Sequence, residues 1–330
     1  MAQSSALQKN TRDTATISEI VYSQRNIIII YALLLAILIV ATILQPRFAT
    51  AENIKNVLVQ ATALGIISVG QTFVILTAGI DISVGSIASL VVVIMSHLAD
   101  RNADGVIGAV LAGLAAGVLV GLLNGLGITR LHVSPFMMTL GTMSVAAGVA
   151  LQLRPQPGGL IPAEFGWLAS NQFLGIPVPI YLFALVVLVG GFVLKFTRFG
   201  KHIYAVGGNE ETTRLSGLPT DRIKVGAYLV SGLCAAIAGV FLSSRIRSGD
   251  ASIGTSFGLD SITAVVLGGT SLFGGKGSLA GTIAGVFIIA SLSNIMNLIG
   301  VSTYYQYILK GGILIIAVSF YYYRRRSHGA

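Results

Sequence analysis

Long apolar runs follow one another from Ile27 to Tyr323, separated by short polar breaks, and constrain the fold of this chain more than any other feature. A helix needs about 20 apolar residues to cross the hydrocarbon core of a bilayer. Hydrophobic residues make up 54% of the chain and charged residues 10%, which lies far outside the range of soluble globular domains. The sequence therefore predicts an all-α, polytopic membrane protein with no separate soluble domain.

The runs resolve into about ten candidate spans, which predict a transmembrane helical bundle. They are Ile27–Leu44, Ile54–Thr77, Val84–Leu98, Gly105–Thr129, Ser134–Leu153, Val178–Phe196, Val225–Leu242, Gly258–Thr270, Ser278–Ile299 and Thr303–Tyr323. The third and the eighth are short for a full crossing, so we expect broken or re-entrant helices at these two places.

The basic residues predict the orientation, because the excess of Lys and Arg stays on the cytoplasmic side. With the N-terminus inside, the cytoplasmic side holds Lys9, Arg12, Arg25, Arg130, Lys195, Arg198, Lys201, Arg214, Arg222, Lys224 and Arg324 to Arg326. The opposite side holds fewer, namely Arg47, Lys55, Arg101, Arg154, Arg245 and Arg247, and Lys276 and Lys310 stay unassigned. We therefore predict a cytoplasmic segment 1–26, one transmembrane domain 27–323 and a cytoplasmic tail 324–330. No small-residue cleavage site follows the first run, which is interpreted as a retained span.

The stretch Gly200–Leu218 is a polar island between two apolar runs and reads G-K-H-I-Y-A-V-G-G-N-E-E-T-T-R-L-S-G-L. Asn209 is a good helix N-cap because its side-chain oxygen can accept a free first-turn N–H, and the two glutamates after it suit the positive helix start. Gly217 suits the left-handed position that ends such a helix. Within a cytoplasmic loop 197–224, we predict an exposed helix of about two turns that presents Arg214 to solvent or to a partner.

A second polar stretch, Ala78–Ser86, reads A-G-I-D-I-S-V-G-S and interrupts an apolar run. A carboxylate at bilayer depth costs at least ~2.5–3.5 kcal/mol, so Asp81 should face protein or a water-filled path. A broken helix that lines a cavity would satisfy the backbone groups freed by the interruption. The alternative is a tight cytoplasmic turn over Ala78–Ser83, in which Asp81 caps the next helix.

A glycine-rich stretch, Gly268–Ser278, reads G-G-T-S-L-F-G-G-K-G-S and carries Lys276. It lacks the G-x-x-x-x-G-K-[ST] spacing of a phosphate-binding loop, so we interpret it as part of a re-entrant or broken membrane helix. Two further charges, Asp260 and Lys310, lie in or near spans. We expect each to be solvated at an interface or to reach one by snorkelling.

The sequence contains no residue pattern that is typical of an enzyme active site or a metal site. The single cysteine, Cys234, excludes an intrachain disulfide and a thiolate cluster, and the four histidines are scattered without metal-ligand spacing. No span carries a carboxylate pair, a Ser-His-Asp set or a Glu-x-x-His pattern. We predict no catalytic residue, no metal site and no cofactor in this chain. The scarcity of ionisable groups in the spans also disfavours an ion-coupled carrier.

Four separated motifs resemble those of a known family. They are A-G-I-D-I-S-V-G-S at Ala78–Ser86, P-F-M-M-T-L-G-T-M-S at Pro135–Ser144, Y-A-V-G-G-N-E-E-T-T-R-L-S-G-L at Tyr204–Leu218, and L-D-S-I-T-A-V-V-L-G-G-T-S-L-F-G-G-K-G-S at Leu259–Ser278. In this order, over nearly the whole chain, they resemble the ribose-type permeases. These are the membrane subunits of bacterial ABC importers for ribose, xylose, arabinose and related small polyols.

The resemblance implies a dimer, of one permease or of two related ones, that contacts lipid in the bacterial inner membrane and binds no nucleic acid. A periplasmic binding protein would deliver the sugar, and a separate ATPase subunit, which binds ATP and Mg, would dock on the predicted exposed helix. The implied coupling residues are Asn209, Glu210, Glu211, Arg214, Leu215, Ser216 and Gly217. Candidate path residues are Asp81, Ser83, Ser86, Thr139, Thr142 and Asn294, with a helix-packing role open for the hydroxyl groups.

An ATP-independent secondary carrier or channel for a small polar solute is the alternative function. It predicts transport that follows an ion gradient, with coupling abolished by Asp81→Asn. The importer, which the resemblance implies, instead predicts transport that depends on ATP hydrolysis in a partner docked on the exposed helix.

Overall fold

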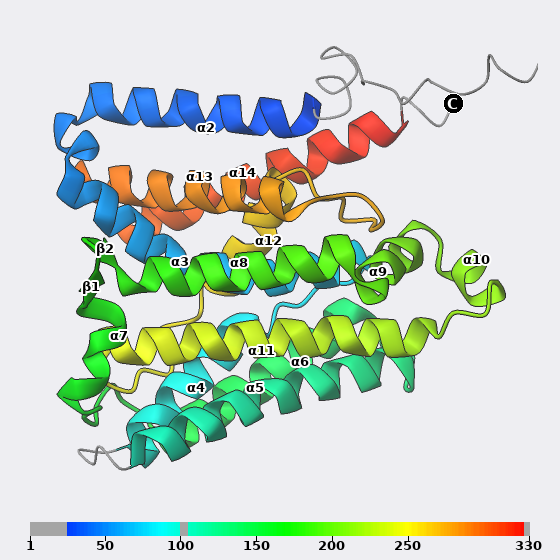
Figure 1. The fold of residues 1–330 in the computed structure, drawn as a ribbon, viewed down its shortest axis with the longest axis horizontal. Coiled ribbons are helices and arrows are strands. Elements are labelled where there is room, and N and C mark those ends of the chain that lie inside the picture. The colour runs from blue at the N-terminus through cyan, green and yellow to red at the C-terminus, as the bar shows by residue number, and fades with distance from the viewer. Residues whose placement is uncertain (1–24, 100–104, 327–330) are drawn as a thin grey trace, which may run out of the picture.

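The computed structural model describes residues 25–99 and 105–326, and most of them lie in helices (Figure 1). Residues 1–24 of the predicted N-terminal segment, with Lys9 and Arg12, lie outside the described residues, as do Arg101 and the end of the tail after residue 326.

Each predicted span corresponds to one helix. The helices are α2 (Arg25–Leu44), α3 (Ala51–Leu76), α4 (Val84–Leu98), α5 (Gly105–Thr129), α6 (Pro135–Leu153), α8 (Val178–Phe196), α11 (Thr220–Ile246), α12 (Phe257–Leu267), α13 (Leu279–Leu298) and α14 (Thr303–Arg326). Within the described ranges, seven helices are long and apolar enough to cross a membrane, and α4 and α12 are shorter, as predicted. The prediction of an all-α polytopic bundle is therefore confirmed.

Short elements gather at the two ends of the bundle (Figure 1). One end, here called the α10 end, carries α9 (Arg198–Gly208) and α10 (Glu210–Leu215). The other, the α7 end, carries a set of turns and one small hairpin. They are η1 (Pro46–Ala49), η2 (Ala163–Gly166), α7 (Trp167–Ser170) and the antiparallel strands β1 (Gln172–Phe173) and β2 (Ile176–Pro177), with Phe173 paired to Ile176.

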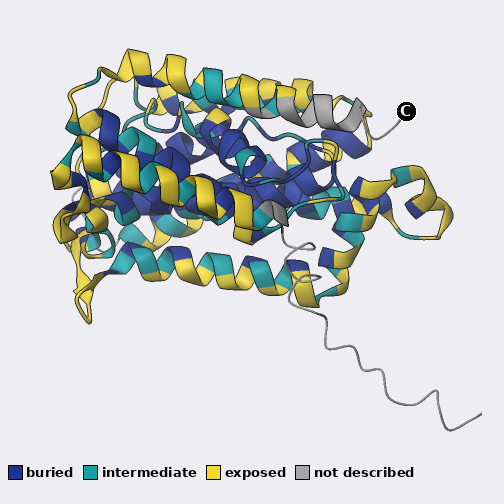
Figure 2. Ribbon diagram, turned by 90° about the horizontal axis from the view of Figure 1, so that it is seen from above, coloured by how far each residue is buried: buried dark blue, intermediate teal, exposed yellow. Residues whose placement is uncertain are grey.

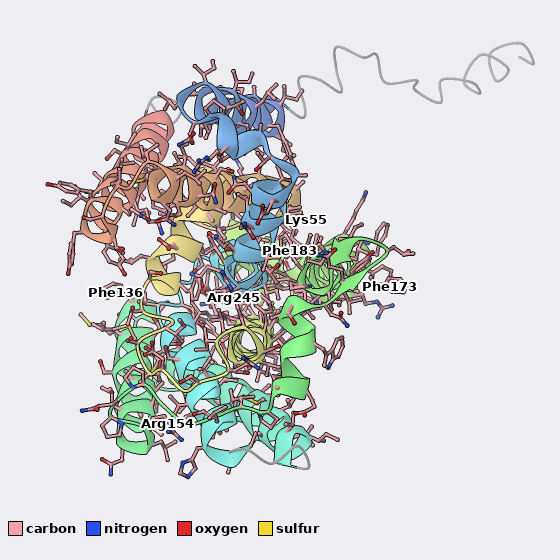
Figure 3. The ribbon with its side chains drawn as sticks, turned by 90° about the vertical axis from the view of Figure 1, so that its left-hand side faces the viewer. Lys55, Phe136, Arg154, Phe173, Phe183 and Arg245 are labelled. Atoms are coloured by element: carbon pink, nitrogen blue, oxygen red, sulfur yellow. The ribbon has the colours of Figure 1, made fainter. Side chains whose placement is uncertain are left out.

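The centre of the bundle is formed by α3 and α11, with the most apolar helices around them. In α3 83% of the most apolar stretch is buried, against 17% in α2 and in α6. Figure 2 shows the buried centre and the exposed outer helices. Where α5 crosses α11, Gly117 and Gly232 bring the two backbones so close that a Cβ on either would clash with the other's carbonyl oxygen. This is the small-residue packing typical of membrane helices. Viewed from the α7 end, Phe183 of α8 lies toward α3, where it packs on Gly65 (Figure 3).

Two of the long helices are followed by a half-length helix. After α3 ends at Leu76, the chain turns back into the bundle before α4 begins, and after α11 it returns from the α7 end before α12 begins. The half-helices run away from each other, α4 toward the α7 end and α12 toward the α10 end (Figure 1). Their starts meet inside the bundle, where a Cβ on Gly85 would clash with the carbonyl oxygen of Gly254, and the reverse holds too. The predicted broken helices are confirmed at both places.

This arrangement is an internal repeat of opposite direction. The series α3–α4–α5–α6 and α11–α12–α13–α14 follow the same order, but α3 and α11 run oppositely along the bundle (Figure 1). Three sequence segments of the first half recur in the second half in the same order. They are E-N-I-K at Glu52–Lys55 and D-R-I-K at Asp221–Lys224, D-I-S-V-G-S at Asp81–Ser86 and D-A-S-I-G-T at Asp250–Thr255, and L-A-G-L-A-A-G-V at Leu111–Val118 and L-A-G-T-I-A-G-V at Leu279–Val286. Inverted repeats of this kind place a transport path near the middle of the bilayer, between the two halves.

The contact between Gly85 and Gly254 predicts a specific intolerance. Gly85→Val should lower the free energy of unfolding by about 1–3 kcal/mol, because the new side chain overpacks a backbone contact. Gly108→Val on α5 is the matched control, since a Cβ there meets nothing within 4 Å. Thermal unfolding of the two purified variants in the same detergent measures the difference, and equal stability would contradict this placement of the half-helices.

Candidate functional site

The exposed helix predicted at the α10 end is present as α10, and its caps are those expected. The Asn209 side-chain oxygen accepts from the N–H of Thr212 at 2.9 Å, and Gly217 has a φ of +81°. The apolar Leu215 is 80% exposed at the tip of α10, beside Glu211 and Ser216, which are exposed as well. An exposed apolar side chain framed by charges suits contact with another protein.

Ion pairs hold α10 against the start of α11. The Glu210 carboxylate contacts the ammonium group of Lys224 and lies 3.6 Å from the Arg214 guanidinium. Glu210 is therefore partly engaged within the chain, whereas the Arg214 side chain is 59% exposed and available to a partner. On the buried side, Thr213 Oγ1 donates to the carbonyl oxygens of Ala205 and Asn209 at 2.9 Å and 2.7 Å.

Helix α9 joins α10 to the break after α3. A Cβ on Gly207 would clash with the Leu76 carbonyl oxygen, and the N–H of Gly275 donates to that same oxygen at 3.0 Å. Tyr204 donates to the carbonyl oxygen of Gly277 at 3.0 Å, and burial raises the pKa of its hydroxyl, which keeps it a donor. The glycine-rich stretch Gly268–Ser278 is thus a loop wedged between α9 and the end of α3. A displacement of α10 would reach this break through direct backbone contacts.

Asp81 lies in the break between α3 and α4, and its side chain has no exposed surface. The Ser83 N–H and hydroxyl donate to one carboxylate oxygen at 3.0 Å and 2.6 Å, and the Ser231 hydroxyl of α11 donates to the other at 2.8 Å. Three donors satisfy a buried carboxylate that would otherwise be very costly. Asp81 does not cap α4, because it accepts from the N–H of Ser83, the residue before the helix, and no side chain caps its first turn. The complete burial of Asp81 excludes a solvent-exposed turn.

The backbone around Asp81 is held as firmly as its side chain. With its amide oriented to satisfy both groups, Gln71 of α3 donates to the Asp81 carbonyl oxygen at 3.0 Å and accepts from the Asp81 N–H at 3.3 Å. The hydroxyls of Tyr228 on α11 and Thr139 on α6 each donate to the Ile80 carbonyl oxygen at 3.3 Å. An irregular segment inside the bundle is thereby bonded on three sides, which is how such backbone is tolerated at membrane depth.

A polar chain extends from this segment to the outer helix α6. Asn124 of α5 donates to Ser83 Oγ at 2.9 Å, and Thr142 of α6 donates to the Asn124 oxygen at 2.6 Å. Of the predicted path residues, Asp81, Ser83, Thr139 and Thr142 therefore form one network. Sequence reasoning missed Asn124, although it is the one asparagine within an apolar run of 25 residues.

Two predicted path residues lie apart from this network. Asn294 of α13 forms a reciprocal amide pair with Asn53 of α3, with N···O distances of 2.9 Å and 3.0 Å, toward the α7 end. Ser86 is half-buried in the first turn of α4 and forms none of the hydrogen bonds described for this network. The path role predicted for each stays a prediction.

The expectation for Asp260 and Lys310 is wrong. These residues do not reach an interface separately, since Lys310 Nζ of α14 donates to Asp260 Oδ2 of α12 at 2.8 Å. The Lys310 side chain is 18% exposed and the Asp260 side chain is 10% exposed. The pairing was not readable from the sequence because it depends on the way α14 packs back on the half-helix α12.

The sequence of this chain is similar to those of known permeases. Residues 53–318 match the family described as the permease component of the branched-chain amino acid transport system. The chain is 44% identical to the ribose import permease of Bacillus subtilis over 288 residues, which are 86% of this chain and 89% of that protein. It is 38% identical to an L-arabinose ABC transporter permease of Azospirillum brasilense over 312 residues, 93% of this chain and 90% of that protein. No solved structure matches the chain.

The three-donor arrangement at Asp81 predicts the effect of removing one donor. Ser231→Ala should lower the free energy of unfolding by about 1.5–3 kcal/mol, because it removes a hydrogen bond to a buried carboxylate. Ser144→Ala is the control, since that exposed hydroxyl bonds only within its own helix, to the Leu140 carbonyl oxygen. Denaturation of both variants in matched micelles measures the loss. A Ser231→Ala protein as stable as its control would contradict the assigned network.

Proposed function

Because the chain belongs to this family of transporter permease components, we propose that it translocates a monosaccharide or related small polyol delivered by a periplasmic binding protein. It is the membrane permease subunit of an ABC sugar importer, and ATP hydrolysis belongs to a separate subunit. The ribose and arabinose permeases each align with it over most of their lengths. A sugar is favoured over the branched-chain amino acid of the family description because these relatives share a third or more of its residues.

The α10 end faces the cytoplasm in this proposal, and the chain lies in the bacterial inner membrane with both termini inside. The distribution of cations supports this orientation. Arg198, Lys201, Arg214, Arg222 and Lys224 all lie at the α10 end. Lys55, Arg154 and Arg245, assigned to the outer side, lie at the α7 end (Figure 3). The α7 end would then receive the binding protein.

The observation that carries the proposal is the direct contact from α10 through α9 to the break beside Asp81. The partner ATPase, with ATP and Mg, docks on α10 around Leu215 and Arg214. Closure of the ATPase subunits pushes α10, and α9 transmits the displacement to Leu76 and to the half-helix α4. The path between the two halves then opens toward the loaded binding protein, and hydrolysis resets it.

A second copy of the chain, or a related permease, completes the path, with lipid around the pair. Helices α6 and α14 flank the starts of the half-helices and present glycines outward. A Cβ on Gly141, Gly148, Gly311 or Gly312 would meet nothing within 4 Å. Exposed glycines allow another helix to approach closely, which supports an interface on this face.

The alternative is a secondary carrier that uses Asp81 for ion coupling. The complete burial of Asp81 and its three donors favour a role in packing instead. Asp81→Asn separates the two functions. It should destabilise the importer without creating or removing an ion-gradient dependence, whereas a carrier would lose gradient-driven uptake.

Charge reversal on α10 tests the importer directly. Arg214→Glu should reduce ATP-dependent sugar uptake at least tenfold, because the exposed guanidinium is lost from the ATPase contact while the fold is kept. Arg214→Lys is the matched control, because it keeps the positive charge at this exposed position. Uptake and co-purification of the ATPase are measured with both variants in the native membrane. Unchanged uptake and assembly in Arg214→Glu would refute the placement of the coupling helix.

A further inference from the structure

Among the described residues, the contact between Asp260 and Lys310 is the one ion pair that joins two helices within the bundle. Lys310 lies about 10 Å along α14 from its start at Thr303, at 1.5 Å per residue, and Asp260 lies in the first turn of α12 inside the bundle. Both side chains keep some exposed surface at this depth. Charge facing hydrocarbon is costly, so this face requires a polar occupant.

The pair also has unused hydrogen-bonding capacity. Among the described residues, one bond joins the two side chains, from Lys310 Nζ to Asp260 Oδ2. An ammonium group has three donors and a carboxylate accepts several bonds, so acceptor and donor sites stay open side by side. Asp81 is the contrast, since three donors occupy its carboxylate and it has no exposed surface.

Apolar contacts also hold α12 and α14 together, so the ion pair is not their only contact. Leu314 and Val318 of α14 pack on the apolar cluster that includes Ile262 and Val265 of α12. Access to the pair is open, because the neighbouring side chains Tyr307 and Leu259 are 52% and 57% exposed.

The internal repeat places Lys310 on the face predicted for the path. Lys310 is the eighth residue of α14, as Thr142 is the eighth residue of α6. Each of these helices packs on the half-helix of its own half, α6 on α4 and α14 on α12. The polar positions on α6 and on α14 therefore correspond under the repeat.

We propose that Asp260 and Lys310 form a hydroxyl-binding subsite for the sugar in transit, with the carboxylate accepting from one hydroxyl and the ammonium donating to its neighbour. This inference rests on the proposed function, because it takes the face of α6 and α14 as the path. A polar site of this kind discriminates against solutes that lack the hydroxyls, since its own groups are then left unpaired.

Uptake by the reconstituted complex with its ATPase and binding protein tests the subsite, with ribose as the probe. Asp260→Asn and Lys310→Met should each lower uptake at least tenfold while ATP hydrolysis stays within twofold of wild type. The double variant Asp260→Lys/Lys310→Asp restores an ion pair but reverses donor and acceptor, so uptake should stay low. Wild-type uptake in the double variant or in Asp260→Asn would overturn the proposal. The ion pair would then serve only to hold α12 and α14 together.

Thiol labelling decides the question if these variants fail to assemble. In a Cys234→Ala background, Tyr307→Cys should react with a charged, membrane-impermeant thiol reagent, and ribose should slow that reaction. Leu188→Cys on α8, a position 70% exposed on the outer surface, should not react. Equal inertness of both thiols, or no protection by ribose, would overturn the subsite. Absence of ATP-dependent uptake by the wild-type complex would count against the proposed function instead.

Discussion

The structure depends on the cost of placing a carboxylate inside a membrane. Asp81 interrupts an apolar run, and the chain meets that cost with donors from Ser83 and Ser231. Ser83 lies in the break itself and Ser231 lies on α11, so satisfying the charge fixes the position of the break against α11. Asn124 and Thr142 extend the same network to the outer helix α6. The backbone of the break is irregular, but these hydrogen bonds fix its position in the bundle.

The inverted repeat explains why a second break exists and why the two differ. Asp250 and Ser252 repeat the local bonds of Asp81 and Ser83, at 2.8 Å and 2.7 Å, yet Asp250 is only half-buried. In the first half, Asp81 is bonded to another helix. In the second half, the equivalent residue Asp250 lies nearer the surface. In transporters built from inverted repeats, one repeat moves against the other around a fixed site, so each break lies between parts that can move.

Much of this was predictable from local sequence. The positions of the spans follow from apolar runs, and the N-cap at Asn209 and the left-handed Gly217 follow from local chemistry. The pairing of Asp260 with Lys310 and the junction of Gly207 with Leu76 were not predictable, because each joins elements that are distant in the chain. The repeated D-x-S motif could have predicted the second break, because the two copies of the motif can be recognised from the sequence alone.

In the proposed mechanism, a displacement of α10 is transmitted through α9 to the break between α3 and α4. Hydrogen–deuterium exchange of the amides in Thr77–Val84 tests it most directly, in the nanodisc-embedded complex with and without vanadate-trapped nucleotide. The account predicts that trapping changes exchange in this segment in the wild-type complex and not when Arg214 is replaced by Glu. Exchange that stays the same on trapping, in a complex that transports sugar, would contradict it.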